Sequence, residues 1–172
     1  MYPLHKAWCL YTDEYFQNML KIGTFDSIQT FWELFNNIPD PSKLPHRRNY
    51  RLFHEQVQPL SEDKSNITGG QWIVNIDNRT KLNAAFLELT LAAVGNTLGQ
   101  DVTGLVVNVR HRTSRLCVWT RYGGQDDRQL ELGKKIKKIV DVDAENKLFF
   151  KLHKETTEKN HSAFRAQVVM TC

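Results

Sequence analysis

The stretch VTGLVVNVRHRTSRLCVWT, residues 102–120, decides the fold. Val102–Val109 and Arg115–Thr120 are rich in β-branched and apolar residues, which favours strands, and the polar residues His111–Ser114 between them favour a turn. Strands joined by so short a connection pair antiparallel, because a parallel pair needs a crossover of about a dozen residues or more. We therefore predict a β-hairpin here.

Helices are predicted on both sides of this hairpin, Lys81–Leu98 before it and Asp126–Val140 after it. The first has an apolar face at helical spacing, formed by Leu82, Ala85, Phe86, Leu89 and Ala93. The second is amphipathic and basic. A third helix is expected to be capped by Asp26 or Ser27 and to end before Pro39. Its apolar positions are Ile28, Phe31, Trp32 and Phe35.

The remaining strands are expected to be short. They are Trp8–Leu10, Tyr50–His54, Trp72–Asp77, Leu148–Leu152 and Phe164–Met170. Loops are predicted at Pro41–Arg48, Ser61–Gly70 and His153–Ser162. Because strands outnumber helices and often follow one another directly, we predict an α+β fold with one antiparallel sheet and helices on one face. The other face is then free to bind a ligand.

The composition fits one domain over residues 1–172, since chains divide into separate cores only at roughly 250 residues or more. Apolar residues make up 41% of the chain, and four Trp, nine Phe and five Tyr predict an aromatic core and site. The net charge of +4 is too small to establish a nucleic-acid partner, so the distribution of charge must decide.

The sequence predicts a cytoplasmic protein that does not contact a membrane. The N-terminal residues lack the charged segment and apolar run of a signal peptide, and no stretch approaches the roughly 18 apolar residues of a membrane helix. Cys9, Cys117 and Cys172 are odd in number and form no CxxC pair. Neither a disulfide framework nor a zinc ribbon is therefore expected.

The sequence contains no recognisable motif for catalysis. We therefore expect that the protein is not an enzyme and that it binds neither a metal ion nor a cofactor. The common phosphate-loop, dinucleotide, metalloprotease and hydrolase patterns are absent. The six histidines are scattered, and each is expected at the surface rather than as a ligand or general base: His5, His46, His54, His111, His153 and His161. Glu62 and Asp63 are adjacent carboxylates, but sequence neighbours do not usually converge on one bond.

Positive charge gathers at the predicted hairpin turn. Arg110, Arg112 and Arg115 lie close together there, and Arg121 follows. Guanidinium groups at such a tip can converge on phosphate oxygens, although a cluster of this kind can also be a solvated turn. The nearby Trp119 favours a nucleotide ligand, because arginine and aromatic side chains together suit nucleotides.

Several segments resemble, in the same order, those of the eukaryotic translation initiation factor 4E family of messenger-RNA cap-binding proteins. FDSIQTFW at residues 25–32 resembles the family's FD-(T/S)-V-x-x-FW segment. Further matches are YRLF at 50–53, GGQW at 69–72, FLE at 86–88, VVNVR at 106–110 and VWT at 118–120. Each match is weak alone, but the ordered set is specific. The resemblance implies a curved sheet with three helices on its convex face and a cap pocket on its concave face.

The resemblance also implies a role for each site residue. Methylation of guanine at N7 leaves a delocalised positive charge, which aromatic faces attract. Glu62 is expected to accept the two parallel N–H groups of the guanine edge, and Trp119 to lie near the methyl group. The triphosphate is expected to meet Arg110 and Arg115, with Arg112 close by.

Two stacking positions depart from the family pattern. The family usually has Trp before the carboxylate, whereas this chain has Ser61, preceded by Leu60, and Ser61 can offer only a backbone N–H to the guanine oxygen. Stacking is worth roughly 1–3 kcal/mol per base, so cap affinity should fall unless another side chain fills the slot. The second stacking residue is Tyr15 by ungapped spacing, with Phe16 next and Tyr11 as a further substitute.

A separate surface is implied for the YxxxxLΦ helix of scaffold and repressor proteins, where Φ is apolar. It comprises Tyr2, Pro3, Ile28, Trp32, Leu87, Glu88 and Gly95. A helix in an apolar groove with an aromatic anchor is a common recognition mode. Trp32 and Leu87 could instead be core residues, but the neighbouring Glu88 favours a partner surface.

The predicted function is that of a monomeric adaptor that joins capped messenger RNA to a translation scaffold. The alternative is a diverged relative that acts mainly as a protein-interaction module or translational repressor with weak cap affinity. Ser61 favours the alternative, whereas Glu62, Trp119 and the arginines favour the adaptor. The sequence leaves open which cap methylation state is preferred.

Overall fold

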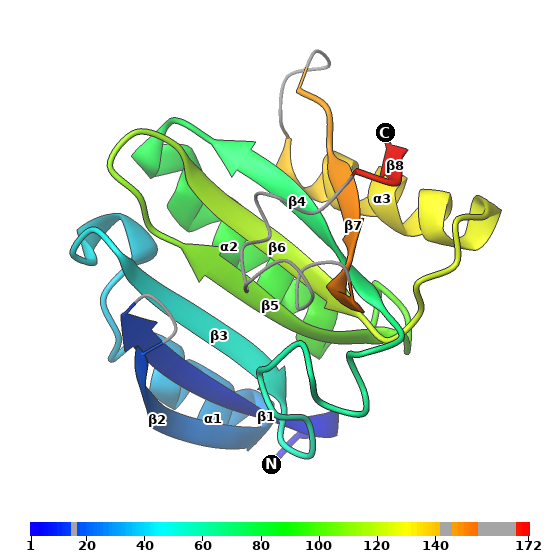
Figure 1. The fold of residues 1–172 in the computed structure, drawn as a ribbon. Helices are drawn as coiled ribbons and strands as arrows, with labels where there is room; N and C mark the ends of the chain where they lie inside the picture. The colour runs from blue at the N-terminus through cyan, green and yellow to red at the C-terminus, as the bar shows by residue number, and fades with distance from the viewer. Residues whose placement is uncertain (15–16, 142–145, 155–167) are drawn as a thin grey trace.

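The computed structural model describes residues 1–14, 17–141, 146–154 and 168–172. The described strands form one eight-stranded antiparallel sheet in the order β2-β1-β3-β5-β6-β4-β7-β8 (Figure 1). Their bounds are β1 Pro3–Glu14, β2 Gln17–Ser27, β3 Arg48–His54, β4 Gly70–Ile76, β5 Val102–Asn108, β6 Ser114–Thr120, β7 Phe149–Leu152 and β8 Met170–Thr171. The predictions of a single antiparallel sheet and of the β5–β6 hairpin are confirmed.

Three α-helices within the described ranges lie behind the sheet in Figure 1 and cover one of its faces. They are α1 Ile28–Phe35, α2 Arg79–Val94 and α3 Asp127–Val140. The large core joins Phe31, Leu89 and Ile136 of the helices to the sheet residues Leu52 and Val118. Helices on one face were predicted, and this is confirmed. None of the described helices is long and apolar enough to span a membrane.

Trp72 fixes α3 against the sheet. Its side chain is fully buried, and its indole Nε1 donates a hydrogen bond to Gln129 Oε1 of α3 at 3.2 Å. Gly133 faces the ring, and a Cβ atom at that position would lie 2.6 Å from it. The helix can therefore approach the sheet closely only because residue 133 has no side chain.

Capping hydrogen bonds decide where α1 begins. Ser27 Oγ accepts the Thr30 N–H at 3.3 Å, and Thr30 Oγ1 accepts the Ser27 N–H at 3.2 Å. Ser27 rather than Asp26 is therefore the cap. The predicted loop after this helix contains one 3-10 turn, Pro41–Lys43.

The ends of α2 differ from the predicted Lys81–Leu98. The helix begins two residues earlier, because the Asn78 side chain accepts the N–H groups of residues 80 and 81. It ends at Val94, and Gly95 is its C-cap. The prediction was therefore wrong at both ends, whereas the predicted α3 is confirmed, with Asp126 as its N-cap.

The N-terminal ribbon was largely missed by the sequence prediction. Trp8–Leu10 was expected to be a strand, but β1 runs over 12 residues and β2 was not predicted at all. In β2 only Phe25 and Ser27 are buried, so alternation is hard to detect in this edge strand. The predicted strand Phe164–Met170 and loop His153–Ser162 lie largely outside the described residues.

The sheet face opposite the helices, toward the viewer in Figure 1, is called the front face below. Because side chains alternate along a strand, it carries a second and smaller apolar cluster. That cluster consists of Phe53, Val57, Ile73, Val106, Cys117 and Trp119. The adjacent residues Leu52 and Val118 belong to the helix-side core instead.

Gly104 of β5 makes room for the Phe53 ring, since a Cβ atom there would lie 2.4 Å from that ring. We predict that Gly104→Ala lowers the free energy of unfolding by about 1–3 kcal/mol, because overpacking displaces a fully buried ring. Urea denaturation measures this change. Asn75→Ala, at an exposed position of β4, is the control and should change stability by less than about 0.5 kcal/mol. An unchanged midpoint for Gly104→Ala would contradict the packing described.

Candidate functional site

Trp119 is the centre of the aromatic end of the front face. Its ring lies 5.2 Å from that of Phe53 at an interplanar angle of 87°, and 4.1 Å from that of His153. The side chain is 6% exposed, and its buried Nε1 has no hydrogen-bond partner among the described residues. Val57, from the loop after β3, belongs to the same cluster and brings that loop to this end of the sheet.

Two guanidinium groups lie toward the other end of the front face. Arg115 precedes Trp119 by four residues on β6, so both side chains leave the same face and their Cα atoms lie roughly 13 Å apart. Arg110 follows β5, and its Nη1 donates to Asn49 Oδ1 of β3 at 3.1 Å. This arrangement suits a ligand with an aromatic ring at one end and negative charge at the other.

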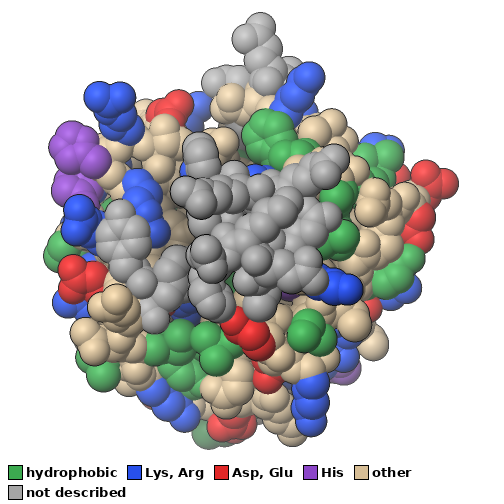
Figure 2. All heavy atoms as spheres, viewed as in Figure 1, with side chains coloured by type: hydrophobic (Ala, Val, Ile, Leu, Met, Phe, Trp, Pro, Cys, Tyr) green, Lys and Arg blue, Asp and Glu red, His purple; other side chains and the backbone are tan. Residues whose placement is uncertain are grey.

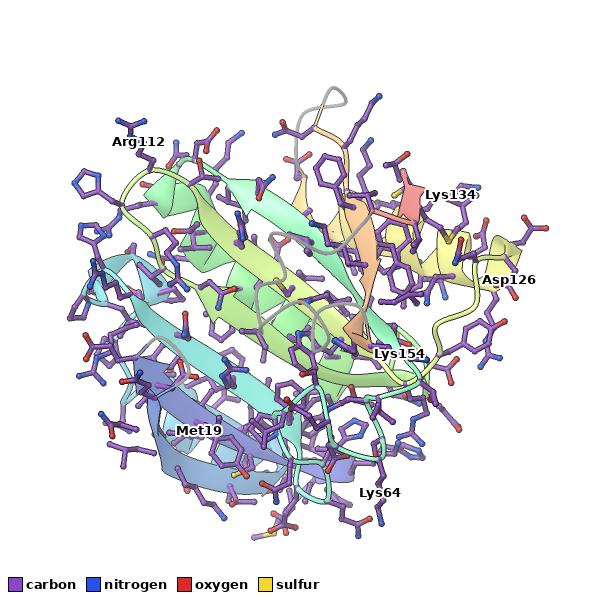
Figure 3. All side chains as sticks on the ribbon, in the orientation of Figure 1. Met19, Lys64, Arg112, Asp126, Lys134 and Lys154 are labelled. Atoms are coloured by element: carbon purple, nitrogen blue, oxygen red, sulfur yellow. The ribbon has the colours of Figure 1, made fainter. Side chains whose placement is uncertain are left out.

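Arg112 lies at the tip of the turn between β5 and β6 and points away from the sheet (Figure 3). Basic and histidine side chains gather at this edge of the molecule (Figure 2). The rings of His46 and His111 are 4.8 Å apart there, and Arg79 Nη2 lies 3.1 Å from His46 Nδ1. The predicted arginine cluster is therefore divided, with Arg112 at the rim rather than on the face.

The loop between β3 and β4 is anchored by Asn66, which is fully buried. Its Nδ2 donates to the carbonyl oxygens of Gln58 at 3.1 Å and Leu60 at 2.9 Å. Its Oδ1 accepts a hydrogen bond from Thr103 Oγ1 at 2.8 Å. One amide side chain thus shapes the loop and ties it to the beginning of β5.

Glu62 and Asp63 have different environments on this loop. Glu62 is exposed, and Ser61 Oγ donates to its Oε2 at 3.2 Å. The Asp63 carboxylate instead accepts the N–H groups of Gln58 at 3.2 Å and Ser65 at 2.8 Å, so it closes the loop. The preceding Leu60 is 46% exposed. Glu62 is therefore the carboxylate of this pair that faces solvent.

Three polar residues beneath the arginines were not predicted as part of a site. Asp13, Asn49 and Arg51 are each at most 1% exposed and are linked by hydrogen bonds on the front face. The available signal was the alternation of polar and apolar residues in RNYRLF, where Asn49 and Arg51 flank Tyr50. Such alternation usually marks a solvated strand face, and here that face is buried.

The prediction that every histidine lies at the surface was wrong for His54 and His153, which are 8% and 0% exposed. His54 packs edge-on against Trp8 at 4.2 Å, and His153, which directly follows β7, packs against Trp119. Burial lowers the pKa of His153 to about 3 and that of His54 to about 4, so both rings are neutral at pH 7.

Cys117 lies between Arg115 and Trp119 on the same face of β6. Burial raises the pKa of its thiol to about 12, although nearby arginines favour the thiolate. The thiol is therefore protonated at neutral pH and packs as an apolar side chain. In the part of the chain that the structure describes, no three His, Cys, Asp or Glu side chains are placed to hold a metal ion.

A groove lies on the helix side of the sheet, between α1 and α2. It has a volume of about 260 Å³, and Trp32, Phe35, Phe86 and Leu87 contribute to its lining. Trp32 is 38% exposed. Glu88, on the next position of α2, is exposed.

The N-terminal segment lies against the beginning of α1. The Ile28 N–H donates to the Tyr2 carbonyl oxygen, and the Tyr2 N–H donates to Gln29 Oε1, both at 3.0 Å. Tyr2 and Ile28 are 69% and 46% exposed, and Pro3 is exposed as well. Gly95, at the far end of α2, is also exposed. The residues named for a partner surface are thus at or near the molecular surface.

Residues 3–168 match the family model described as eukaryotic initiation factor 4E. The chain belongs to this family. Initiation factor 4E-1 of Schizosaccharomyces pombe is 31% identical over 179 residues, which cover 97% of this chain and 82% of that protein. Initiation factor 4E1 of Drosophila melanogaster is 30% identical, and the match covers 94% of this chain and 66% of that protein. The chain thus spans about two thirds of the Drosophila relative.

Solved structures of other initiation factor 4E proteins share the fold. Factor 4E-3 of Caenorhabditis elegans, in complex with the 4E-binding protein Mextli and a cap analog, has a TM-score of 0.89 at 28% identity and covers 99% of each chain. Factor 4E-3 of Ascaris suum with an m7G cap has a TM-score of 0.86 at 26% identity, covering 99% of this chain and 97% of that one. A second Ascaris complex holds an m2,2,7G cap, with a TM-score of 0.84, 28% identity and 97% coverage of both chains.

The two positions predicted to stack on the base differ from the family pattern. Ser61 stands on the loop anchored by Asn66 and has no ring to offer. Tyr15 and Phe16, the predicted substitutes, lie outside the described residues. Tyr11 is half-buried on β1, and burial is the main cause that raises its pKa to about 12.

The buried His153 gives a testable pH dependence. Its pKa is about 3 when folded and 6.5 when unfolded, so the unfolded chain binds more protons between those values. The free energy of unfolding should therefore fall as the pH decreases from about 6.5 toward 3. We expect melting temperatures between pH 7 and 4 to fall less steeply for His153→Gln than for the wild type. His5→Gln, at an exposed position, is the control. Equal slopes for wild type and His153→Gln would contradict the neutral buried ring.

Proposed function

We propose that this chain binds the 7-methylguanosine cap of messenger RNA through its front face. The observation that carries the proposal is the placement of Trp119 and Arg115 four residues apart on one face of β6. The loop that bears Glu62 is anchored at the Trp119 end through Val57. The Caenorhabditis and Ascaris relatives whose solved structures contain a cap or cap analog support it.

A cationic base suits the aromatic end. The positive charge of N7-methylguanine is attracted by an aromatic face by about 0.5–2 kcal/mol, depending on desolvation. Trp119 would lie near the methyl group, and its ring is already held by Phe53 and His153. The exposed Glu62 carboxylate would accept both N–H groups of the guanine edge in charge-assisted hydrogen bonds. Unmethylated guanine lacks the charge and should bind more weakly.

The triphosphate would extend along β6 toward Arg110 and Arg115. Guanidinium groups can bind phosphate oxygens through two parallel hydrogen bonds, which sets direction as well as affinity. Arg112 lies at the rim and points away from the sheet, so it would meet the outer phosphates or the first nucleotide beyond them. Tyr15, with Phe16 as second choice, would supply the stacking face that Ser61 lacks.

The proposed role is recognition without chemical conversion of the ligand. The chain would act as a monomer in the cytoplasm, where it joins a capped messenger RNA to a scaffold protein. Since the Ascaris relative has been solved with both m7G and m2,2,7G caps, both ligands are appropriate probes for this chain.

Glu62→Ala tests the base contact. We expect wild-type protein to bind 7-methylguanosine triphosphate more tightly than guanosine triphosphate in a titration followed by tryptophan quenching. Loss of the carboxylate should weaken binding of the methylated nucleotide by about 1.5–3 kcal/mol, the worth of hydrogen bonds to a charged group. Lys64→Ala is the control, because Lys64 lies on the same loop and points away from the sheet (Figure 3). Equal or undetectable binding of the two nucleotides by the wild type would refute the proposal.

We further propose that the groove between α1 and α2 binds a YxxxxLΦ helix of a scaffold or repressor. The groove is lined mainly by apolar side chains, and the partly exposed Trp32 can act as its aromatic anchor. The Caenorhabditis relative was solved with the 4E-binding protein Mextli, which supports a protein partner for this family fold. Because the groove lies on the helix side, a partner helix and a cap would not compete for space.

Trp32→Ala tests the groove. We expect it to weaken binding of a YxxxxLΦ peptide by more than about 1 kcal/mol, as for a central aromatic anchor, and to leave cap affinity unchanged. Isothermal titration with the peptide and with 7-methylguanosine triphosphate measures both. Leu20→Ala, at a 60% exposed position of β2, should change neither. Full peptide affinity in Trp32→Ala would place the partner surface elsewhere.

The alternative function is a translational repressor or interaction module with weak cap affinity. Ser61 favours it, because one stacking face is missing from the family's usual position. Strong peptide binding by a wild-type protein that does not distinguish methylated from unmethylated nucleotide would establish this alternative.

A further inference from the structure

We propose that the buried Asp13–Arg51 ion pair is a positioning device that holds both halves of the cap site in their binding geometry. The inference rests on the proposed cap-binding function and assigns roles to residues beneath the ligand. It concerns two separate contacts of the site: the loop that carries Glu62 and the phosphate-binding Arg110.

The pair lies on the front face of neighbouring strands. Arg51 Nε on β3 is 2.6 Å from Asp13 Oδ2 on β1, and the side chains are 1% and 0% exposed. Burying two charges costs several kcal/mol per ion, which their attraction seldom recovers in full. A gain in folding stability therefore does not readily explain why this ion pair is buried. Its hydrogen bonds to neighbouring segments indicate a positioning role instead.

The first contact leads from Arg51 to the base end of the site. Its Nη1 donates to the carbonyl oxygen of Pro59 at 3.1 Å, and Pro59 is buried three residues before Glu62. One planar guanidinium thus binds Asp13 and the loop at fixed relative directions. Together with Asn66, which binds the Leu60 carbonyl oxygen, it fixes the segment just before Glu62.

The second contact leads from Asp13 to the phosphate end. Asp13 Oδ1 accepts a hydrogen bond from Asn49 Nδ2, so the Asn49 oxygen faces the other way. That oxygen accepts from Arg110 Nη1 at 3.1 Å and from Asn108 Nδ2 at 2.9 Å. Because a carboxylate can only accept, the charge of Asp13 sets the orientation of the Asn49 amide. The amide in turn holds the Arg110 guanidinium over the front face.

Both contacts lower the cost of ordering the site when ligand binds. A loop and a long side chain that are already held lose less conformational freedom on binding. Because the network is buried, its hydrogen bonds gain strength from the low local dielectric. Asp13 and Arg51 are thus positioning residues, which act on the ligand through Glu62 and Arg110.

Two ratios separate these contacts in the test. The methyl preference is the Kd for guanosine triphosphate divided by the Kd for 7-methylguanosine triphosphate, and it reports the base end. The phosphate increment is the Kd for 7-methylguanosine monophosphate divided by the Kd for the triphosphate, and it reports the arginines. A variant that only lowers the folded fraction weakens all ligands equally and changes neither ratio.

Arg51→Lys keeps the charge beside Asp13 but loses the guanidinium fork that reaches Pro59. We expect its methyl preference to fall about tenfold, the equivalent of one charge-assisted hydrogen bond, with the phosphate increment retained. Asn49→Ala should lower the phosphate increment and retain the methyl preference. The double variant Asp13→Leu/Arg51→Met should lower both ratios while remaining folded, because apolar residues of similar volume often replace a buried ion pair without loss of stability.

Arg128→Met is the control, since Arg128 pairs with Asp101 in an ion pair at the protein surface. It should leave both ratios unchanged. If the wild type shows no methyl preference, the proposed function itself fails. If the wild type prefers the methylated cap and any folded variant of the three keeps both ratios, the ion pair is structural only and the inference is overturned.

Discussion

The site depends on the register with which β6 pairs with both of its neighbours. Cys117 lies opposite Val106 of β5 and opposite Ile73 of β4, and this alignment puts Trp119 and Arg115 on the front face. A slip of one residue would reverse every side chain of the strand. The side chains of Trp119 and Arg115 would then point toward the helix-side core. The front face would lose both its aromatic end and a positive charge at its other end.

The helix-side core provides the stability that the front face uses. Most large apolar side chains, including the fully buried Trp72, pack between the sheet and the helices. The front face instead buries Asp13, Asn49 and Arg51, groups that cost free energy when they leave water. A strong apolar layer on one side therefore allows a polar, preorganised layer on the other. Such a division is typical of binding proteins, in which functional residues are often ones that stability alone would not favour.

The sequence predicted those elements whose periodicity is clear. The β5–β6 hairpin, α3 and the middle of α2 all have regular apolar spacing, and their types were correct. It did not predict β2, because most side chains of that edge strand are exposed. It placed the ends of α2 wrongly, because a single cap such as Asn78 outweighs the apolar pattern there.

The candidate site could be predicted only in part, for similar reasons. The family resemblance predicted Glu62, Trp119 and the arginines as site residues, since they occur in or beside ordered motifs. Asn66 and the Asp13–Arg51 pair were not predicted, because a buried polar residue in a loop or strand cannot be distinguished from a surface residue by sequence alone. Part of their role comes from contacts between distant segments, as between Arg51 and Asp13, which are 38 positions apart, and between Thr103 and Asn66, which are 37 apart.

Adjacent residues of one strand serve opposite surfaces, as Leu52 and Phe53 do on β3. The front face and the α1–α2 groove share no side chain. The free-energy effects of substitutions in the two surfaces should therefore be additive. After gene duplication, natural selection can therefore relax RNA recognition in one copy while preserving its docking to proteins. Ser61 is at a position that this separation would leave free to change, since it lies on the β3–β4 loop and does not line the α1–α2 groove.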